Sequence, residues 1–582
     1  MTIGRGTTIH VAFVLFASAA SVAMACIPLY GAPAIEVEIG FQSHVVPERY
    51  APIRVRIRGY DERTPARLLV VQTLGSEWRD TSIVRQDLGI GVTADGIYEA
   101  TLPVYEPLNP IDVFLVAEDG RVLAETSLQL RATRHLELFE LRYGPYPLSG
   151  AADEPLVAAD LPPDWWAYDA VRVLWISAPP PQEAWSAIGR WVLAGGSVVL
   201  AAGPDYFRFD SPTLRSLLPF SDPTLEPSDG TTLALSGSLR SGASISFSRG
   251  DLPLLVGWRY GAGHVAVLTI RPADLAAEEL EGIAAAIPDA VRLSMIPVSE
   301  AVLRGLPVIR PTHLSALLLI ALTVTVWAVI VYVGRRYRRT GAACGVALVA
   351  ALAVWSGFFA NRATEYAVVY SVSTTFHLAT SFGIDADSLS FFTPSQLVRD
   401  YALPGVAIPL QAPTSAAAPH PFDAFMPQTT ATPWLYAHTA APGRVTASTG
   451  PGELKTFLAF ADSQSAPRLA VSGPAIATLE YAGDVRLADC WLIVDGQGAR
   501  VPEVSSGVTR FAPSILQPLG TLVREANDDP AALLLQHAAE LLPLHQGVWF
   551  VGISELRPPS TPQLNRKVRH LDAYVVRGTG HE

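Results

Sequence analysis

The hydrophobic pattern is dominated by a pair of uncharged runs near the middle of the chain. Residues 314–333 and 341–360 each form 20 residues without a charged side chain, and a helix of about 20 residues rises roughly 30 Å, the thickness of the hydrocarbon core of a bilayer. The short segment between the runs contains four arginines, Arg335, Arg336, Arg338 and Arg339. Because short arginine-rich loops stay in the cytoplasm, the pattern predicts a transmembrane hairpin of two helices joined by a cytoplasmic loop at 334–340.

The N-terminus has the pattern of a secretory signal peptide. After Arg5, residues 11–25 form an uncharged stretch that ends in small residues, as signal peptides do. We expect the signal peptide to span 1–25, with residue 34 as the latest cleavage point. Cys26 follows the first cleavage site directly, so it is either a lipidation site or part of an ordinary cleaved signal. Export and the hairpin together predict that both large flanks lie outside the cytoplasm.

Residues 35–134 alternate between apolar and polar positions, which is typical of half-buried strands. In residues 53–58 the isoleucines and valine would face one side and Arg54, Arg56 and Arg58 the other. Several short strands within about 100 residues predict an immunoglobulin-like β-sandwich. The arginine face either binds an anionic glycan or lipid headgroup, or is a solvated strand face.

Residues 136–300 change to a pattern of strands and helices. The apolar run 171–177 predicts a strand covered on both faces, residues 184–192 have helical spacing, and 197–202 is the next buried strand. Strand, helix and strand within about 30 residues predict a right-handed crossover in a parallel sheet. The sequence therefore predicts an α/β domain here.

Residues 361–582 predict a second extracytoplasmic β-sandwich. Short strand patterns recur along this tail, and a helix is expected at 530–542, where Pro530 occupies the first position. The Pro- and Ala-rich stretch 403–442 has little periodicity and is expected to be a loop or linker. Cys490 is expected to be buried as a small apolar residue.

Composition fits a chain that is partly in lipid. Of the 582 residues, 49% are hydrophobic and only 16% are charged, with a mean hydropathy of +0.28, whereas soluble domains carry about 25% charged residues. The net charge of −12 argues against a nucleic-acid partner, which would require a basic surface. The chain has only three cysteines, which excludes a disulfide framework.

Three segments carry a resemblance to a known domain family. The segments are LPPDWWAYD at 161–169, RWVLAGGSVVLAAG at 190–203 and YGAGHVAVL at 260–268. Over residues 136–290 the chain resembles the class I glutamine amidotransferase-like domains of bacterial membrane proteins. Together with the hairpin and the β-rich tail, the layout is similar to a family of uncharacterised bacterial membrane proteins, which implies a location in the bacterial cytoplasmic (inner) membrane.

The resemblance does not extend to the chemistry of that fold. Amidotransferases of this class use a cysteine nucleophile and a histidine that deprotonates it. The three cysteines of this chain are Cys26, Cys344 and Cys490, and none of them lies within 136–300. The resemblance therefore implies a catalytically degenerate domain.

The sequence offers one weak candidate pocket. Asp205 and Tyr206 follow the strand at 197–202, at the carboxyl end of a sheet strand, where α/β domains bind ligands. His264 lies in the Gly-rich segment before another strand and is the third candidate. The alternative is that Asp205 and Tyr206 form a turn that closes the sheet. No metal-ligand or nucleotide-binding motif is present in the sequence, and no cofactor is expected.

These observations predict a non-catalytic, membrane-anchored protein of the cell envelope. Its extracytoplasmic domains would bind a partner or ligand or act as a scaffold, and its contacts would be membrane lipid through the two helices and an envelope protein, not nucleic acid. Two alternatives stay open: a hydrolase with an unrecognised site in the α/β domain, and an accessory subunit of an export system.

Overall fold

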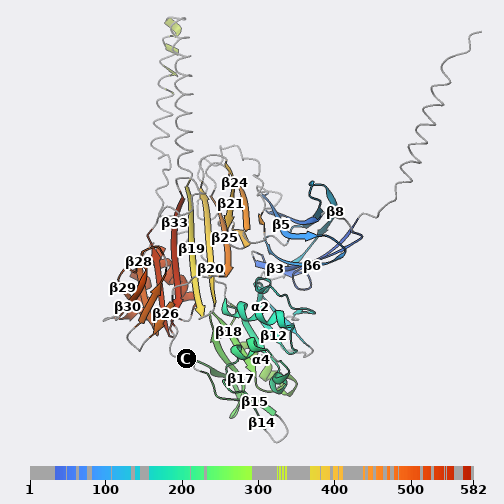
Figure 1. Ribbon diagram of the computed structural model, residues 1–582, viewed down its shortest axis with the longest axis vertical. Helices are drawn as coiled ribbons and strands as arrows, with labels where there is room; N and C mark the ends of the chain where they lie inside the picture. The colour runs from blue at the N-terminus through green and yellow to red at the C-terminus, as the bar shows by residue number, and fades with distance from the viewer. Residues whose placement is uncertain are drawn as a thin grey trace, which may run out of the picture.

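The computed structural model describes residues 33–290 and 368–578, interrupted by gaps of which 411–436 is the longest, together with eight helical positions between 324 and 336. Over these residues the protein is mostly β, with seven sheets and few helices (Figure 1). The several β-rich parts expected from the alternating patterns are therefore present.

The N-terminal part consists of two packed antiparallel sheets. The first has the order β1-β3-β6, comprising β1 (Ala34–Ile39), β3 (Arg49–Arg58) and β6 (Gly96–Val104). The second contains β4 (Ala66–Leu74), β5 (Ser82–Val92), β7 (Ile111–Val116) and β8 (Val122–Leu128). Ile53, Val55 and Ile57 of β3 are buried in a core shared with β4 and β7, which confirms the predicted alternation. A two-stranded parallel sheet, β2 (His44–Val45) and β9 (Arg131–Ala132), completes this part.

The arginines on the outer face of β3 are paired across the sheet. Arg54 binds Glu99 of β6 at 2.8 Å, and Arg56 and Arg58 each lie 3.5 Å from Glu36 of β1. Opposite charges on neighbouring strands are the usual way to stabilise a solvated sheet face. The pairing favours the solvated-face interpretation over binding of an anionic glycan or headgroup.

The middle part is a seven-stranded sheet covered on both faces. Its order is β11-β10-β12-β13-β18-β17-β16. The first five strands are parallel: β11 (Leu156–Val157), β10 (Phe139–Tyr143), β12 (Val171–Ile176), β13 (Ser197–Leu200) and β18 (Gly263–Leu268). The last two are antiparallel: β17 (Leu252–Tyr260) and β16 (Ser244–Arg249).

Two helices cover opposite faces of this sheet. Ile188 of α2 (Gln182–Leu193) shares a core with Leu174 and Leu200, whereas Ile283 of α4 (Ala277–Ala286) shares a core with Val173 and Val199. Neighbouring residues of β12 and β13 thus face different helices, which explains why apolar residues occupy both faces of these strands, apart from Arg172 and Ser197. The predicted strand, helix and strand at 171–202 are confirmed as β12, α2 and β13.

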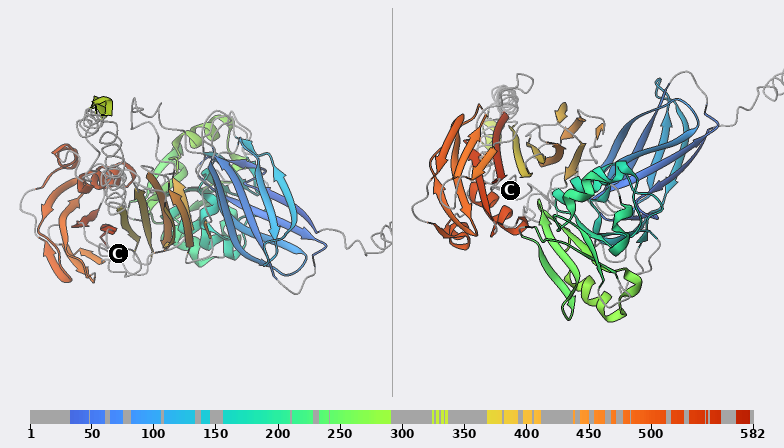
Figure 2. Two further views of the ribbon diagram at one scale, coloured as in Figure 1. Left: turned by 90° about the horizontal axis from the view of Figure 1, so that it is seen from above. Right: turned by 60° about the horizontal axis from the view of Figure 1, so that its bottom comes forward.

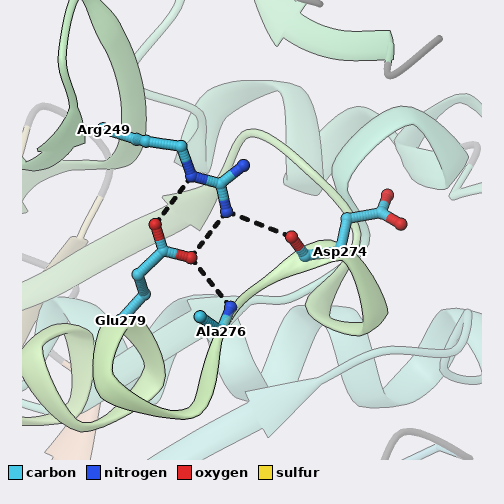
Figure 3. A network of polar contacts seen from close by, with 4 residues as sticks. All are labelled: Arg249, Asp274, Ala276 and Glu279. Carbon is cyan, nitrogen blue, oxygen red and sulfur yellow. Dashed lines mark hydrogen bonds and ion pairs between the residues drawn. The ribbon is translucent and has the colours of Figure 1, made fainter.

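An ion pair holds α4 against the edge strand β16. The guanidinium of Arg249 donates to both carboxylate oxygens of Glu279 at 2.7 and 2.6 Å and to the carbonyl of Asp274 at 3.1 Å (Figure 3). Glu279 also accepts the backbone N–H of Ala276, so it caps the start of α4. The hydrogen bonds from Arg249 lower the pKa of Glu279. The carboxylate therefore stays charged and joins the helix to the sheet.

Short elements fill the connections of the middle part. They are η1 (Trp165–Tyr168), η2 (Gly203–Arg208), α3 (Pro212–Leu217), the hairpin β14 (Thr224–Pro227) and β15 (Leu233–Ser236), and η3 (Pro272–Asp274).

The C-terminal part is built on a nine-stranded sheet of the order β22-β25-β20-β19-β33-β32-β28-β29-β31. Its strands are β19 (Val368–Ala379), β20 (Phe382–Phe392), β22 (Val406–Leu410), β25 (Leu454–Asp462), β28 (Leu487–Val494), β29 (Gln497–Val501), β31 (Gln517–Pro518), β32 (Val548–Ser554) and β33 (Val568–Arg577). A three-stranded sheet comprises β26 (Arg468–Val471), β27 (Ala477–Tyr481) and β30 (Gly507–Phe511). The helices are α8 (Leu519–Glu525) and α9 (Pro530–Leu541), and α9 confirms the helix predicted to begin at Pro530.

Three strands of the tail extend the N-terminal sheet instead of closing a sandwich of their own. They are β21 (Leu397–Leu403), β23 (Ala437–His438) and β24 (Gly443–Thr449). β23 pairs in parallel with β5, so the sheet has the order β21-β24-β23-β5-β4-β7-β8. Without β23, β5 would be an edge strand with unpaired backbone groups. The sequence predicts a domain boundary at residue 361, but strands from both sides of that residue share one sheet.

The N-terminal and middle parts are joined at η1. Asp169, which follows η1, binds the guanidinium of Arg49 at 3.2 Å and accepts the backbone N–H of Tyr50 at 3.1 Å. Asp164, which caps the start of η1, accepts the hydroxyl of Thr101 at 2.6 Å. The rings of Tyr50 and Trp166 lie 5.3 Å apart. Two carboxylates and an aromatic contact therefore fix the middle part on β3 and β6.

One connected apolar core runs through all three parts. It contains Phe41 and Tyr50 of the N-terminal part, Trp185 of α2, and Phe376 and Trp549 of the C-terminal part. Figure 2 shows the middle part bordering both the N-terminal and the C-terminal sheets. This cluster joins the three parts, although the N-terminal part, the α4 face and the C-terminal part each also have a separate core.

The predicted membrane segments fall mostly on residues outside the described ranges. The signal peptide at 1–25, Cys26, Arg338, Arg339 and the helix at 341–360 lie outside them. Within 314–333, five positions are described, and all five are helical. Arg335 and Arg336 are described and helical too. None of the helices formed by described residues is long and apolar enough to cross a membrane.

Candidate functional site at the edge of the seven-stranded sheet

Asp205 and Tyr206 lie on η2, which begins three residues after the end of β13. The turn into η2 is tight, because Gly203 has φ +51 and a Cβ at this position would collide with the backbone of Ile270 and Arg271. A positive φ and close backbone contact favour glycine. Gly203 therefore brings η2 against the segment that follows β18, at the carboxyl ends of the parallel strands.

Asp205 is held in an ion pair with Arg271. Its two oxygens accept from Nε at 3.0 Å and from Nη2 at 3.3 Å, and Arg208 lies 4.0 Å away. The Asp205 side chain is 25% exposed. Both carboxylate oxygens are thus used in a bidentate contact that fixes η2 to the end of β18. The sequence interpretation missed Arg271, although its position directly after a strand of the same sheet was a usable signal.

The Tyr206 side chain packs beneath the carboxyl ends of the parallel strands. Its side chain is buried in the main apolar core, and its ring lies 5.3 Å from that of Phe207. Phe207, which was not singled out in the sequence, is 54% exposed. The structure therefore favours the interpretation of Asp205 and Tyr206 as a turn that closes the sheet.

His264 lies at the amino ends of the parallel strands, on the opposite side of the sheet from Asp205. It is the second residue of β18 and is the register partner of Ser197, the first residue of β13. Asp205 lies beyond the carboxyl end of β13, so the length of that strand, roughly 10 Å, separates it from His264. The three candidate residues do not come together.

The His264 imidazole is largely shielded from water. It packs against Gly257 of β17, where a Cβ would lie 2.8 Å from Nε2. Nδ1 is buried without a hydrogen-bond partner among the described residues. Burial, assisted by the nearby charge of Arg259, lowers the pKa of His264 to about 4. The imidazole is therefore neutral at physiological pH.

The Gly-rich segment at the start of β18 supplies hydrogen-bond donors at the C-terminal end of α2. Ala262 donates its N–H to the carbonyl of Leu193 at 3.0 Å, and His264 donates to the carbonyl of Gly196 at 2.9 Å. A Cβ at Gly263 would collide with the carbonyl of Val192. The last carbonyls of a helix need such donors. This segment therefore serves the helix end, not a phosphate group.

Cys490 is a structural residue of β28. It is fully buried, and burial raises its pKa to about 12. The thiol is therefore protonated and unreactive at neutral pH, which confirms the predicted burial. Among the residues that the structure describes, no cluster of three or more His, Cys, Asp or Glu side chains could hold a metal ion.

No family model and no curated protein matches this chain. The resemblance to amidotransferase-like domains stays a prediction from the sequence. The geometry of the described residues is thus the basis for the functional argument.

Stability should depend on pH through His264. The folded-state pKa of His264 is lowered from 6.5 to about 4, so protonation of the unfolded state favours unfolding in this pH range. The contribution of His264 to the free energy of unfolding is therefore complete above pH 6.5. It is lost as the pH falls toward 4, by about 3 kcal/mol at most. Thermal unfolding of His264→Gln between pH 7 and 4 should show a shallower loss than the wild type. His545→Gln, at an exposed histidine, is the control; identical profiles for all three proteins would contradict the assignment.

Proposed function

We propose that this protein is a membrane-anchored scaffold of the bacterial cell envelope, whose extracytoplasmic domains bind a partner without catalysing a reaction. In this proposal the N-terminal part is an immunoglobulin-like sandwich, the middle part is a degenerate glutamine amidotransferase-like domain, and a two-helix hairpin holds both to the inner membrane. The C-terminal part lies on the same side of the membrane as the other two.

Membrane attachment is supported by sequence and by exposure. The two uncharged runs flank four arginines, as expected of a hairpin with a cytoplasmic loop. At the described helical positions, Val324, Trp327 and Tyr332 are 60%, 65% and 72% exposed. Large apolar side chains exposed at helical positions are costly in water but favourable in lipid.

The observation that carries the non-catalytic proposal is the engagement of Asp205 by Arg271. A general base needs an oxygen that can approach a substrate proton, and both oxygens of Asp205 accept from Arg271. His264 lies at the other edge of the sheet with a buried Nδ1. The middle part also contains no cysteine. The side chains that could have formed a hydrolase site are therefore separated or used in packing.

A scaffold also requires domains that keep a fixed arrangement. The tail strand β23 pairs with β5, and the carboxylates of Asp164 and Asp169 join the middle part to the N-terminal part. The connected apolar core crosses all three parts. These contacts support a single extracytoplasmic body rather than independent domains on flexible linkers.

The orientation of the hairpin can be tested with alkaline-phosphatase fusions. Fusions after Pro311 and after Arg362 should be active, because both points are expected outside the cytoplasm. A fusion at Tyr337 should be inactive, because it lies in the arginine-rich loop. Activity at Tyr337, or inactivity at both outer points, would refute the hairpin.

The non-catalytic proposal can be tested with the full chain in detergent. Asp205→Ala and Arg271→Ala should each lower the free energy of unfolding by about 1 kcal/mol or less, because the pair is partly exposed. In a broad hydrolase screen both variants should match the wild type. The exposed Asp222→Ala is the control variant. If the wild type hydrolyses a substrate, and if Asp205→Ala abolishes this turnover while Arg271→Ala retains it, the proposal is overturned in favour of a hydrolase.

A further inference from the structure

Two hydrogen-bond donors lie side by side at the carboxyl ends of β10 and β12. Arg142 is the fourth residue of β10 and Trp175 the fifth of β12, and the two are register partners in the parallel pair. Partners in register project from the same face of a sheet. Trp175 belongs to the core under α4, so both side chains lie on the α4 face.

Neither donor has an acceptor among the residues that the structure describes. Trp175 is 4% exposed, and its indole Nε1 is buried without a hydrogen bond. The Nε of Arg142 is also buried without a hydrogen bond. The Arg142 side chain as a whole is only partly buried. A buried donor without an acceptor costs free energy, and a guanidinium costs more than a neutral group. Two such donors on adjacent strands are therefore an unexplained feature of a well-packed sheet.

The nearest carboxylate on β10, that of Glu140, does not supply the missing acceptor. Glu140, two residues before Arg142 and on the same face, accepts instead from Arg172. Arg172 also binds Asp289 at 3.1 Å. The charge of Glu140 favours the protonated guanidinium of Arg142, yet burial has the larger effect and lowers the pKa of Arg142. An acceptor from outside the chain would relieve the burial cost.

We propose that Arg142 and Trp175 form a binding site for an oxyanion, a carboxylate or a phosphate group of a small ligand. The guanidinium presents a planar set of donors that matches the oxygens of such groups, and the indole N–H donates to a further oxygen. Neither side chain has an acceptor in its polar group, which excludes a cation as the ligand. The site lies at the carboxyl ends of parallel strands, where open sheets bind ligands.

This site is distinct from the candidate pocket and does not depend on the proposed scaffold function. It shares no residue with Asp205, Tyr206 or His264, and it requires neither a membrane nor a protein partner.

The test uses the full-length protein in detergent, with inorganic phosphate and acetate as probes and chloride at equal ionic strength as the reference. Binding is measured by calorimetric titration and by the shift in the thermal midpoint. Phosphate, acetate or both should bind to the wild type, and the stronger of the two identifies the group. Arg142→Gln and Trp175→Phe should each weaken binding by at least about tenfold. Trp175→Phe keeps an aromatic ring in the core and removes the N–H, so it carries the test even where Arg142→Gln fails to fold.

Arg259→Gln is the matched control, because Arg259 is an exposed arginine on β17 of the same sheet. It should bind the probes as the wild type does. The proposal is overturned if neither probe binds above the chloride reference, or if Trp175→Phe binds within twofold of the wild type. Equal weakening by Arg259→Gln would also overturn it, since the effect would then be one of overall charge.

Discussion

The carboxylate of Asp169 holds two parts of the molecule together. One oxygen binds the guanidinium of Arg49 at 3.2 Å and the other accepts the backbone N–H of Tyr50 at 3.1 Å. The Asp169 side chain is only 13% exposed, so loss of the Arg49 guanidinium would weaken the compensation of a shielded charge. The Trp166 and Tyr50 rings pack beside this contact, and the apolar core continues from there into α2 and the C-terminal part.

The segments that resemble an amidotransferase-like domain have architectural roles in this chain. The segment with two tryptophans forms η1 and docks the middle part on the N-terminal sheets. The Gly-rich segment at 260–264 supplies donors for the end of α2. Asp205 ties η2 to Arg271. Loops used for packing in this way are consistent with the proposed binding or scaffolding role, and the donors of Arg142 and Trp175 are the separate place proposed for a ligand.

Local patterns predicted local structure well. The alternation at 53–58 became β3, and the crossover at 171–202 became β12, α2 and β13. Pairing between distant segments could not be read in this way. β23 joins β5, and β19 pairs with β33 almost 200 residues later, because strand periodicity carries no information about the partner strand. The ion pair of Asp205 with Arg271 likewise joins segments 66 residues apart, and the position of Arg271 after a strand of the same sheet was the one signal for it.

The shared sheet and the core that crosses all three described parts imply one cooperative body. Differential scanning calorimetry of the full-length protein in detergent tests it most directly. The shared sheet and continuous core predict a single endotherm for the wild type, because no part can unfold without exposing the apolar surface of its neighbour. Two or three separate endotherms, each unaffected by Asp169→Ala, would contradict the claim and indicate independent domains.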